Sequence, residues 1–178
     1  MKKILVIICA LLLFTGCSCS MDDTSPEMAI DTFFEKYRTK DENIITQLTD
    51  TIENEDLMDE EKENYKSLME KQYDQFAYVI KDIEVNENKA TATVELTVLD
   101  YKSGILKAEE ELKNNPEKFN GENGEFSEEK YMDYKIEEMT NVTATETHTI
   151  ELTLTKEAGM WKVDQLSDED ISKLHGLY

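Results

Sequence analysis

Residues that carry catalytic chemistry or covalent cross-links are scarce in this sequence. Its 178 residues include three cysteines, two histidines and a single arginine, Arg38. One arginine is too few for phosphate or carboxylate recognition to depend mainly on bidentate contacts. The chain also lacks the motifs of dinucleotide, nucleoside triphosphate, zinc-protease and thiol-redox sites, namely Gly-x-Gly-x-x-Gly, Gly-x-x-x-x-Gly-Lys-Ser/Thr, His-Glu-x-x-His and Cys-x-x-Cys. We therefore expect no cofactor.

Two polar stretches, 53–61 and 120–125, offer oxygen ligands of the kind that calcium prefers. Neither has the Asp/Asn spacing of an EF-hand loop, with its central glycine and a glutamate six residues beyond that glycine. We expect solvated surface at both stretches and no metal site.

Positive charge is scarce as well. Asp and Glu number 40 against 19 Lys and Arg, which gives a net charge of −21. Nucleic-acid binding needs basic side chains that displace counterions from phosphates, so this composition excludes it. It also argues against electrostatic attachment to anionic lipids. A strongly acidic surface instead favours solubility.

Only one long apolar run occurs, Ile4–Phe14, and it follows the basic residues Lys2 and Lys3. As a helix this run would span about 16 Å, well short of a hydrocarbon core of about 30 Å. A basic start, a short apolar core and small residues after it are typical of a secretion signal peptide, here residues 1–16. A permanent membrane-spanning helix is not expected.

The signal ends in Thr15-Gly16-Cys17, which resembles the lipobox of bacterial lipoproteins. The resemblance implies cleavage before Cys17, a diacylglycerol on its sulfur and a cell-membrane location facing outside the cytoplasm. A secreted protein without lipid is the alternative. Two or more acyl chains anchor a protein stably, because each buried methylene contributes about 0.8 kcal/mol. Cys19 would remain as an inert thiol or form an intermolecular bridge.

Residues 17–25 then form the lipidated cysteine and a short polar tether, and a single domain occupies 26–178. The tether spans about 25 Å at full extension, so we expect the domain to lie close to the membrane. Ser25 and Pro26 fit the N-cap and first position of a helix. Further helices are predicted after Asp41 and from about residue 56 to 75, each with apolar residues at helical spacing.

Alternating patterns follow the helices. Strands are predicted at 77–85 and 90–98, joined by a turn at 86–89 whose asparagines tolerate positive φ. A helical excursion, 101–139, separates them from a strand over 142–155, a turn at 157–159, a strand at 160–164 and a last short helix. The predicted class is α+β, with N-terminal helices packed on a curved antiparallel sheet of about four strands and a helical excursion between strands 2 and 3.

The segments Ala29–Phe34, Ile83–Val94, Ile150–Leu152 and Gly159–Asp164 resemble the nuclear transport factor 2-like superfamily, in particular its small bacterial lipoprotein members of unknown function. The resemblance implies a cone in which a curved sheet wraps around helices and encloses a cavity. It implies no particular reaction, because one fold can carry many functions.

Glu146 and His148 are the one pair that suggests chemistry. They lie two residues apart on a predicted strand, so both side chains leave the same face about 6.6 Å apart. In a cavity they could act as general base and acid, as the resemblance to isomerases and dehydratases of this superfamily would imply. Alternatively, this half of the strand overhangs the core and both groups lie in water.

Two further side chains require assignment. Trp161 alternates with Lys162 on the last strand, which favours a place in the core, although a tryptophan can also stack on a ligand. His175 lies near the C-terminus and is expected to be exposed to solvent.

From the sequence we expect a lipid-anchored binding or interaction module without catalysis, whose partner is the membrane together with a small apolar ligand or an envelope protein. Glu146, His148 and Trp161 are its candidate pocket residues. A small enzyme that uses Glu146 and His148, or a purely structural envelope protein, is the alternative.

Overall fold

Three helices precede the first strand in the computed structural model, which describes residues 24–54 and 57–178. They are α1 (Pro26–Arg38), α2 (Glu42–Glu53) and α3 (Asp59–Gln75). The predicted cap of α1 is confirmed, since the Ser25 hydroxyl accepts a hydrogen bond from the Met28 N–H. Helix α3 begins later than predicted, at a turn in which the Glu61 carboxylate accepts a hydrogen bond of 2.7 Å from the Met58 N–H.

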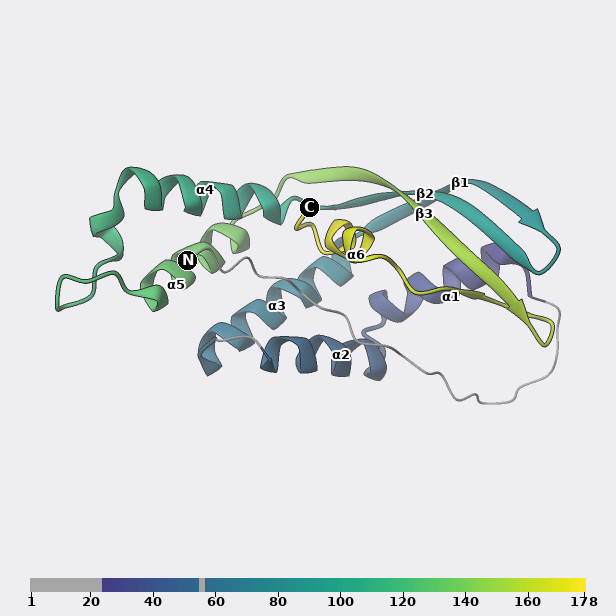
Figure 1. Ribbon diagram of the computed structural model, residues 1–178, viewed down its shortest axis with the longest axis horizontal. Helices are drawn as coiled ribbons and strands as arrows, with labels where there is room; N and C mark the ends of the chain where they lie inside the picture. Colours follow the sequence, from purple (N-terminus) through teal and green to yellow (C-terminus); the bar gives the residue numbers. More distant parts are fainter. Residues whose placement is uncertain (1–23, 55–56) are drawn as a thin grey trace.

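The sheet has four antiparallel strands in the order β1-β2-β3-β4. They are β1 (Ala77–Asn86), β2 (Lys89–Leu99), β3 (Thr145–Glu157) and β4 (Met160–Val163). Helices α1 and α3, with the short α6 (Asp168–Leu174), pack on one face of this sheet (Figure 1). The predicted α+β class is confirmed, including the helical excursion between β2 and β3.

That excursion forms a separate arm. Helix α4 (Tyr101–Asn114) leads through the 3₁₀ helix η1 (Pro116–Phe119) to α5 (Glu128–Thr140), which packs back along α4. Figure 1 shows the arm extending beyond one end of the sheet, opposite the β1–β2 and β3–β4 turns. The Ser127 hydroxyl caps α5 by accepting a hydrogen bond from the Lys130 N–H, as the sequence predicts.

Two apolar clusters hold these layers together. In the first, the inner face of β2 and β3 meets aromatic and aliphatic side chains from α1, the end of α3 and α6. Its fully buried members include Ile30, Phe34, Ala92, Val94, Leu152 and Leu174. The second lies between α2, α3 and the base of the arm. Side chains therefore fill the inner face of the sheet, where the resemblance implied a cavity.

Three local predictions need correction. Strand β3 begins at Thr145, three residues later than predicted. Val142, which was predicted to belong to the strand, is instead buried in the second cluster with 8% exposure. In the β1–β2 turn the positive φ of 55° belongs to Glu87, although an asparagine was expected there. Strand β1 carries a bulge between Ile80 and Asp82 that the pattern of its residues does not predict.

Candidate functional site

Glu146 and His148 lie in the first half of β3, opposite Val98 and Leu96 of β2. The His148 Nε2 and Glu146 Oε2 atoms are 3.7 Å apart, which is an ion-pair distance when the histidine is protonated but too long for a hydrogen bond. The Glu146 side chain is half exposed, whereas that of His148 is 9% exposed. The ring of Tyr178 meets the His148 ring edge to face, with 5.8 Å between centroids.

This pair has few of the supports that acid–base catalysis needs. The ring of His148 is largely buried and packs against the Tyr178 ring, and the carboxylate of Glu146 is half exposed to water. Among the described residues no hydroxyl or further carboxylate hydrogen-bonds to the imidazole. A general base needs an orienting group and a place for a substrate proton within hydrogen-bond reach. The arrangement fits a histidine packed at the margin of the core.

Trp161 lies in β4, far from the pair. It faces Lys156 across the β3–β4 ladder, eight residues along β3 from His148, a separation of about 26 Å. Its indole is 8% exposed within the first cluster, and its backbone N–H donates a 2.8 Å hydrogen bond to the Thr24 hydroxyl. The three candidate pocket residues therefore do not converge, and Trp161 occupies the core position that its alternation favours.

His175 is buried, so the expectation of a solvent-exposed side chain was wrong. Its exposure is 7%, and its Nε2 lies 3.1 Å from the Tyr73 hydroxyl. Nδ1 has no hydrogen-bond partner among the described residues. Burial lowers the pKa of His175 to about 4, because the charged imidazolium would lose its hydration. In the sequence, Leu174 and Leu177 lie on either side of His175 and indicate an apolar segment, from which the burial of the histidine could have been predicted.

A hollow on the surface between α1 and β1 is open to solvent, and two of the side chains that line it, Tyr78 and Asp31, hydrogen-bond to each other. The Tyr78 hydroxyl donates a 2.7 Å hydrogen bond to Asp31, and burial together with this carboxylate raises the Tyr78 pKa to about 12. Arg38 stacks at 5.0 Å from the Tyr78 ring and 5.3 Å from the Phe76 ring. The only arginine thus serves packing. The hollow is lined by Asp31, Thr32, Glu35, Lys36, Thr39 and Tyr78.

A polar network ties the two helices of the arm. Lys107 of α4 pairs with Glu138 of α5, and Lys118 pairs with Glu111 at 3.1 Å. Lys118 also lies 3.8 Å above the Tyr134 ring. The partner Lys107 lowers the pKa of Glu138, as expected for a carboxylate that stays ionised in a salt bridge. These contacts join α4, η1 and α5, so the network is best understood as structural.

Residues 24–54 and 57–178 offer neither a metal site nor a membrane-spanning helix. No group of three or more His, Cys, Asp or Glu side chains in these ranges could hold a metal ion. None of the helices there combines the length and apolar character required to cross a bilayer. The predicted signal peptide and Cys17 lie outside the described residues.

Comparisons with protein-family models, with curated proteins and with solved structures gave no match for this chain.

Proposed function

We propose that this protein is a lipid-anchored, extracytoplasmic interaction module that binds a partner on its outer surface and does not catalyse a reaction. The observation that carries the proposal is the filled inner face of the sheet. Ala92, Val94 and Leu152 are fully buried there beneath helices, in the place where a small ligand would otherwise sit. A partner would then bind to the outer surface of the domain.

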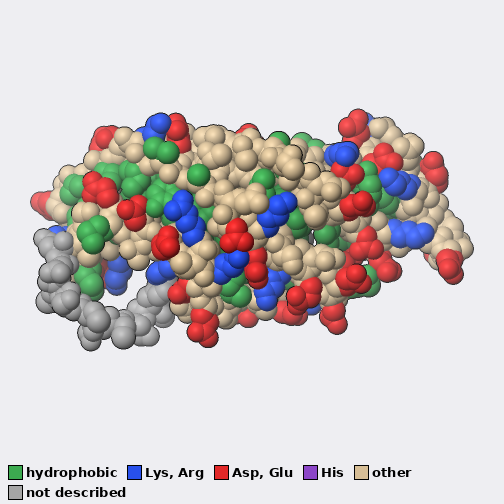
Figure 2. Space-filling view, turned by 180° about the vertical axis from the view of Figure 1, so that it is seen from behind, with side chains coloured by type: hydrophobic (Ala, Val, Ile, Leu, Met, Phe, Trp, Pro, Cys, Tyr) green, Lys and Arg blue, Asp and Glu red, His purple; other side chains and the backbone are tan. Residues whose placement is uncertain are grey.

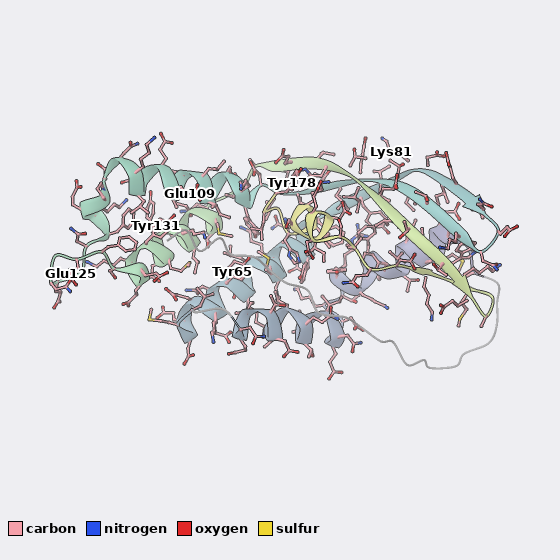
Figure 3. The ribbon with its side chains drawn as sticks, viewed as in Figure 1. Tyr65, Lys81, Glu109, Glu125, Tyr131 and Tyr178 are labelled. Carbon is pink, nitrogen blue, oxygen red and sulfur yellow. The ribbon has the colours of Figure 1, made fainter. Side chains whose placement is uncertain are left out.

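The arm is the part of that exterior best suited to a partner. It extends beyond the sheet and carries two exposed large apolar side chains, Leu106 at 51% and Phe126 at 53%. Figure 3 places Glu125 in the loop at its tip and Tyr131 between its helices. An apolar contact surrounded by carboxylates favours an envelope protein with a basic rim.

The anchor is supported by the signal-like segment and by the lipobox-like ending at Cys17. The α+β class agrees with what the resemblance to nuclear transport factor 2-like lipoproteins implies, although the implied cavity is filled, and we extend that assignment to this chain as part of the proposal. After loss of residues 1–16 the chain would carry 17 basic and 40 acidic residues, a net charge of −23. Attachment would therefore depend on acyl chains rather than on attraction to anionic lipids.

Two cysteine variants test the anchor. Cys17→Ser should release the protein from the membrane fraction and remove the diacylglycerol mass from the intact protein. Cys19→Ser, two residues away, should stay membrane-bound and keep that mass. Retention of the Cys17→Ser protein on the membrane with an unchanged mass would refute the lipid anchor.

A second comparison tests the surface. Membranes that contain the wild-type protein, Phe126→Ser or the control Val79→Ser are treated with a short cross-linker. Val79 is equally exposed, at 55%, but lies on β1. We expect a saturable cross-linked band that disappears in Phe126→Ser alone. Its absence from the wild type, or equal loss in both variants, would refute binding through the arm.

A further inference from the structure

The described chain begins at one particular end of the molecule. Thr24 accepts a 2.8 Å hydrogen bond from the backbone N–H of Trp161, and α1, which starts two residues later, packs beside β4. Figure 1 shows the start of α1 at the same end as the β1–β2 and β3–β4 turns. We call this end, defined by Met28, Val85 and Met160, the turn end. Any anchor upstream of Thr24 therefore joins the domain here.

Three exposed apolar side chains lie near the turn end, on both faces of the sheet. Met28 of α1 is 56% exposed, Val85 of β1 is 56% exposed and Met160 of β4 is 41% exposed. They come from three different elements, and Figure 2 shows hydrophobic side chains on the surface at this end. Methionine is flexible and adapts to irregular apolar surroundings, which suits contact with lipid. Within the described part of the chain, the fold leaves these three side chains largely uncovered.

The arm at the opposite end is strongly acidic. Residues 101–141 contain eleven Asp and Glu against six Lys, a net charge of −5, and Figure 2 shows acidic side chains over that end. A bilayer with anionic lipids repels such a surface within a Debye length. Strand β3 is about 43 Å long and α4 about 21 Å, and they follow one another along the molecule (Figure 1). The tip of the arm thus lies about 60 Å from the turn end.

We infer that the turn end rests on the outer surface of the lipid bilayer, with Met28, Val85 and Met160 in the headgroup region and the arm directed away from the membrane. The inference rests on the proposed lipid anchor, because the six residues between Cys17 and Thr24 allow at most about 25 Å between lipid and domain. This length brings the turn end to the bilayer, and it falls well short of the arm. The contact is apolar rather than electrostatic, since the two turns, residues 84–89 and 156–162, together carry three glutamates and three lysines, whose charges cancel.

An environment-sensitive label at two matched positions tests the orientation. In a Cys19→Ser background, Met160→Cys and Phe126→Cys place one reactive thiol at the turn end and one near the tip of the arm, where the native side chains are 41% and 53% exposed. The lipidated full-length proteins carry a nitrobenzoxadiazole label and are reconstituted into vesicles of phosphatidylethanolamine and phosphatidylglycerol. We expect a blue shift and enhanced emission at position 160 upon vesicle binding, and an unchanged spectrum at position 126.

Flotation of the same vesicles separates the two proposals. Protein that does not float refutes the lipid anchor itself. Protein that floats without a spectral change at position 160 refutes contact between the turn end and the lipid. Equal changes at positions 160 and 126 refute the upright orientation, because a molecule lying flat would bring both labels to the bilayer.

Discussion

Two buried polar side chains, Gln72 and His175, lie where the C-terminal segment meets α3. The Gln72 amide donates to the Leu99 carbonyl oxygen at 3.2 Å and accepts from the Leu99 N–H at 2.9 Å. It thereby completes the hydrogen bonding at the end of β2, as a neighbouring strand would. The Gly176 carbonyl accepts from the Lys102 N–H at 2.8 Å, so the same junction also fixes the start of α4.

His175 makes stability at this junction depend on pH. Its pKa in the folded protein is about 4, against an ordinary value of 6.5, so between these pH values the unfolded chain binds a proton that the folded chain does not. Stability should be fully present above pH 6.5 and should fall as the pH drops towards 4, by about 3 kcal/mol for this group. Urea denaturation at a series of pH values measures the loss.

His175→Gln provides the comparison for that series. The variant keeps an amide that can bond to the Tyr73 hydroxyl but cannot take up a proton. Carboxylates titrate in both proteins, so the difference between the two slopes at pH 5 to 6.5 isolates the histidine. Identical slopes would contradict a neutral buried His175.

Gly176 and Gly159 allow a matched test of close packing. Both have positive φ, of 70° and 85°, but a methyl group at Gly159 would meet open space, whereas one at Gly176 would collide with the Leu99 carbonyl oxygen. Gly159→Ala should cost about 1 kcal/mol, the ordinary penalty of a left-handed residue. Gly176→Ala should cost roughly 3 kcal/mol or more, because steric overlap adds to that penalty. If both substitutions lowered the free energy of unfolding equally, the backbone around Leu99 and Gly176 would have moved to make room for the methyl group.

At the scale of elements, the bulge in β1 illustrates what the sequence predicts and what it leaves out. Tyr78 and Ile80 face the helices, and the inward pattern resumes at Ile83, one residue out of phase. The strand was predicted from the change to an alternating pattern. That pattern does not reveal the extra residue, because a bulge is defined by the pairing with a neighbouring strand. The alternation in β2 needs no such correction, and its five inward residues are buried as predicted.

The two helices of the arm cross at Gly104. A methyl group there would lie 2.9 Å from the backbone of Glu138 and Met139, so α4 and α5 can approach closely only because the side chain is absent. Gly104→Ala should lower the free energy of unfolding by roughly 1–3 kcal/mol through overpacking, which outweighs the gain in helix propensity. Thermal denaturation measures this effect.

Leu106→Ala is the control on the same helix, since Leu106 is half exposed and its truncation should change stability little. If Gly104→Ala proved as stable as this control, the close crossing of α4 and α5 would be disproved.

For the whole molecule, net charge affects stability in a way that local patterns do not show. Carboxylates outnumber basic groups twofold, and most ion pairs involve exposed side chains. Self-repulsion destabilises a compact acidic chain, and salt screens it. The urea midpoint should therefore rise between about 0.05 M and 0.5 M potassium chloride, measured near pH 7.5. A midpoint that falls with salt would show that the attractive pairs outweigh the repulsion.

The candidate site was less predictable than the fold. Helix caps and strand alternation are local, so Ser25, Ser127 and β2 could be recognised from neighbouring residues. The environment of His148 and His175 depends on a segment that returns from the other end of the sequence. Tyr178 packs against the His148 ring, and Tyr73 lies within hydrogen-bond distance of His175. No local sequence pattern predicts either contact.

The buried junction also bears on when this polypeptide can become native. Leu174 fills a place in the first cluster, and Gly176 fits against the end of β2, although both are translated after every strand. Without residues 174–176 the first cluster lacks one of its buried side chains and the end of β2 lacks a neighbour, so pairing of the four strands alone cannot complete the native packing.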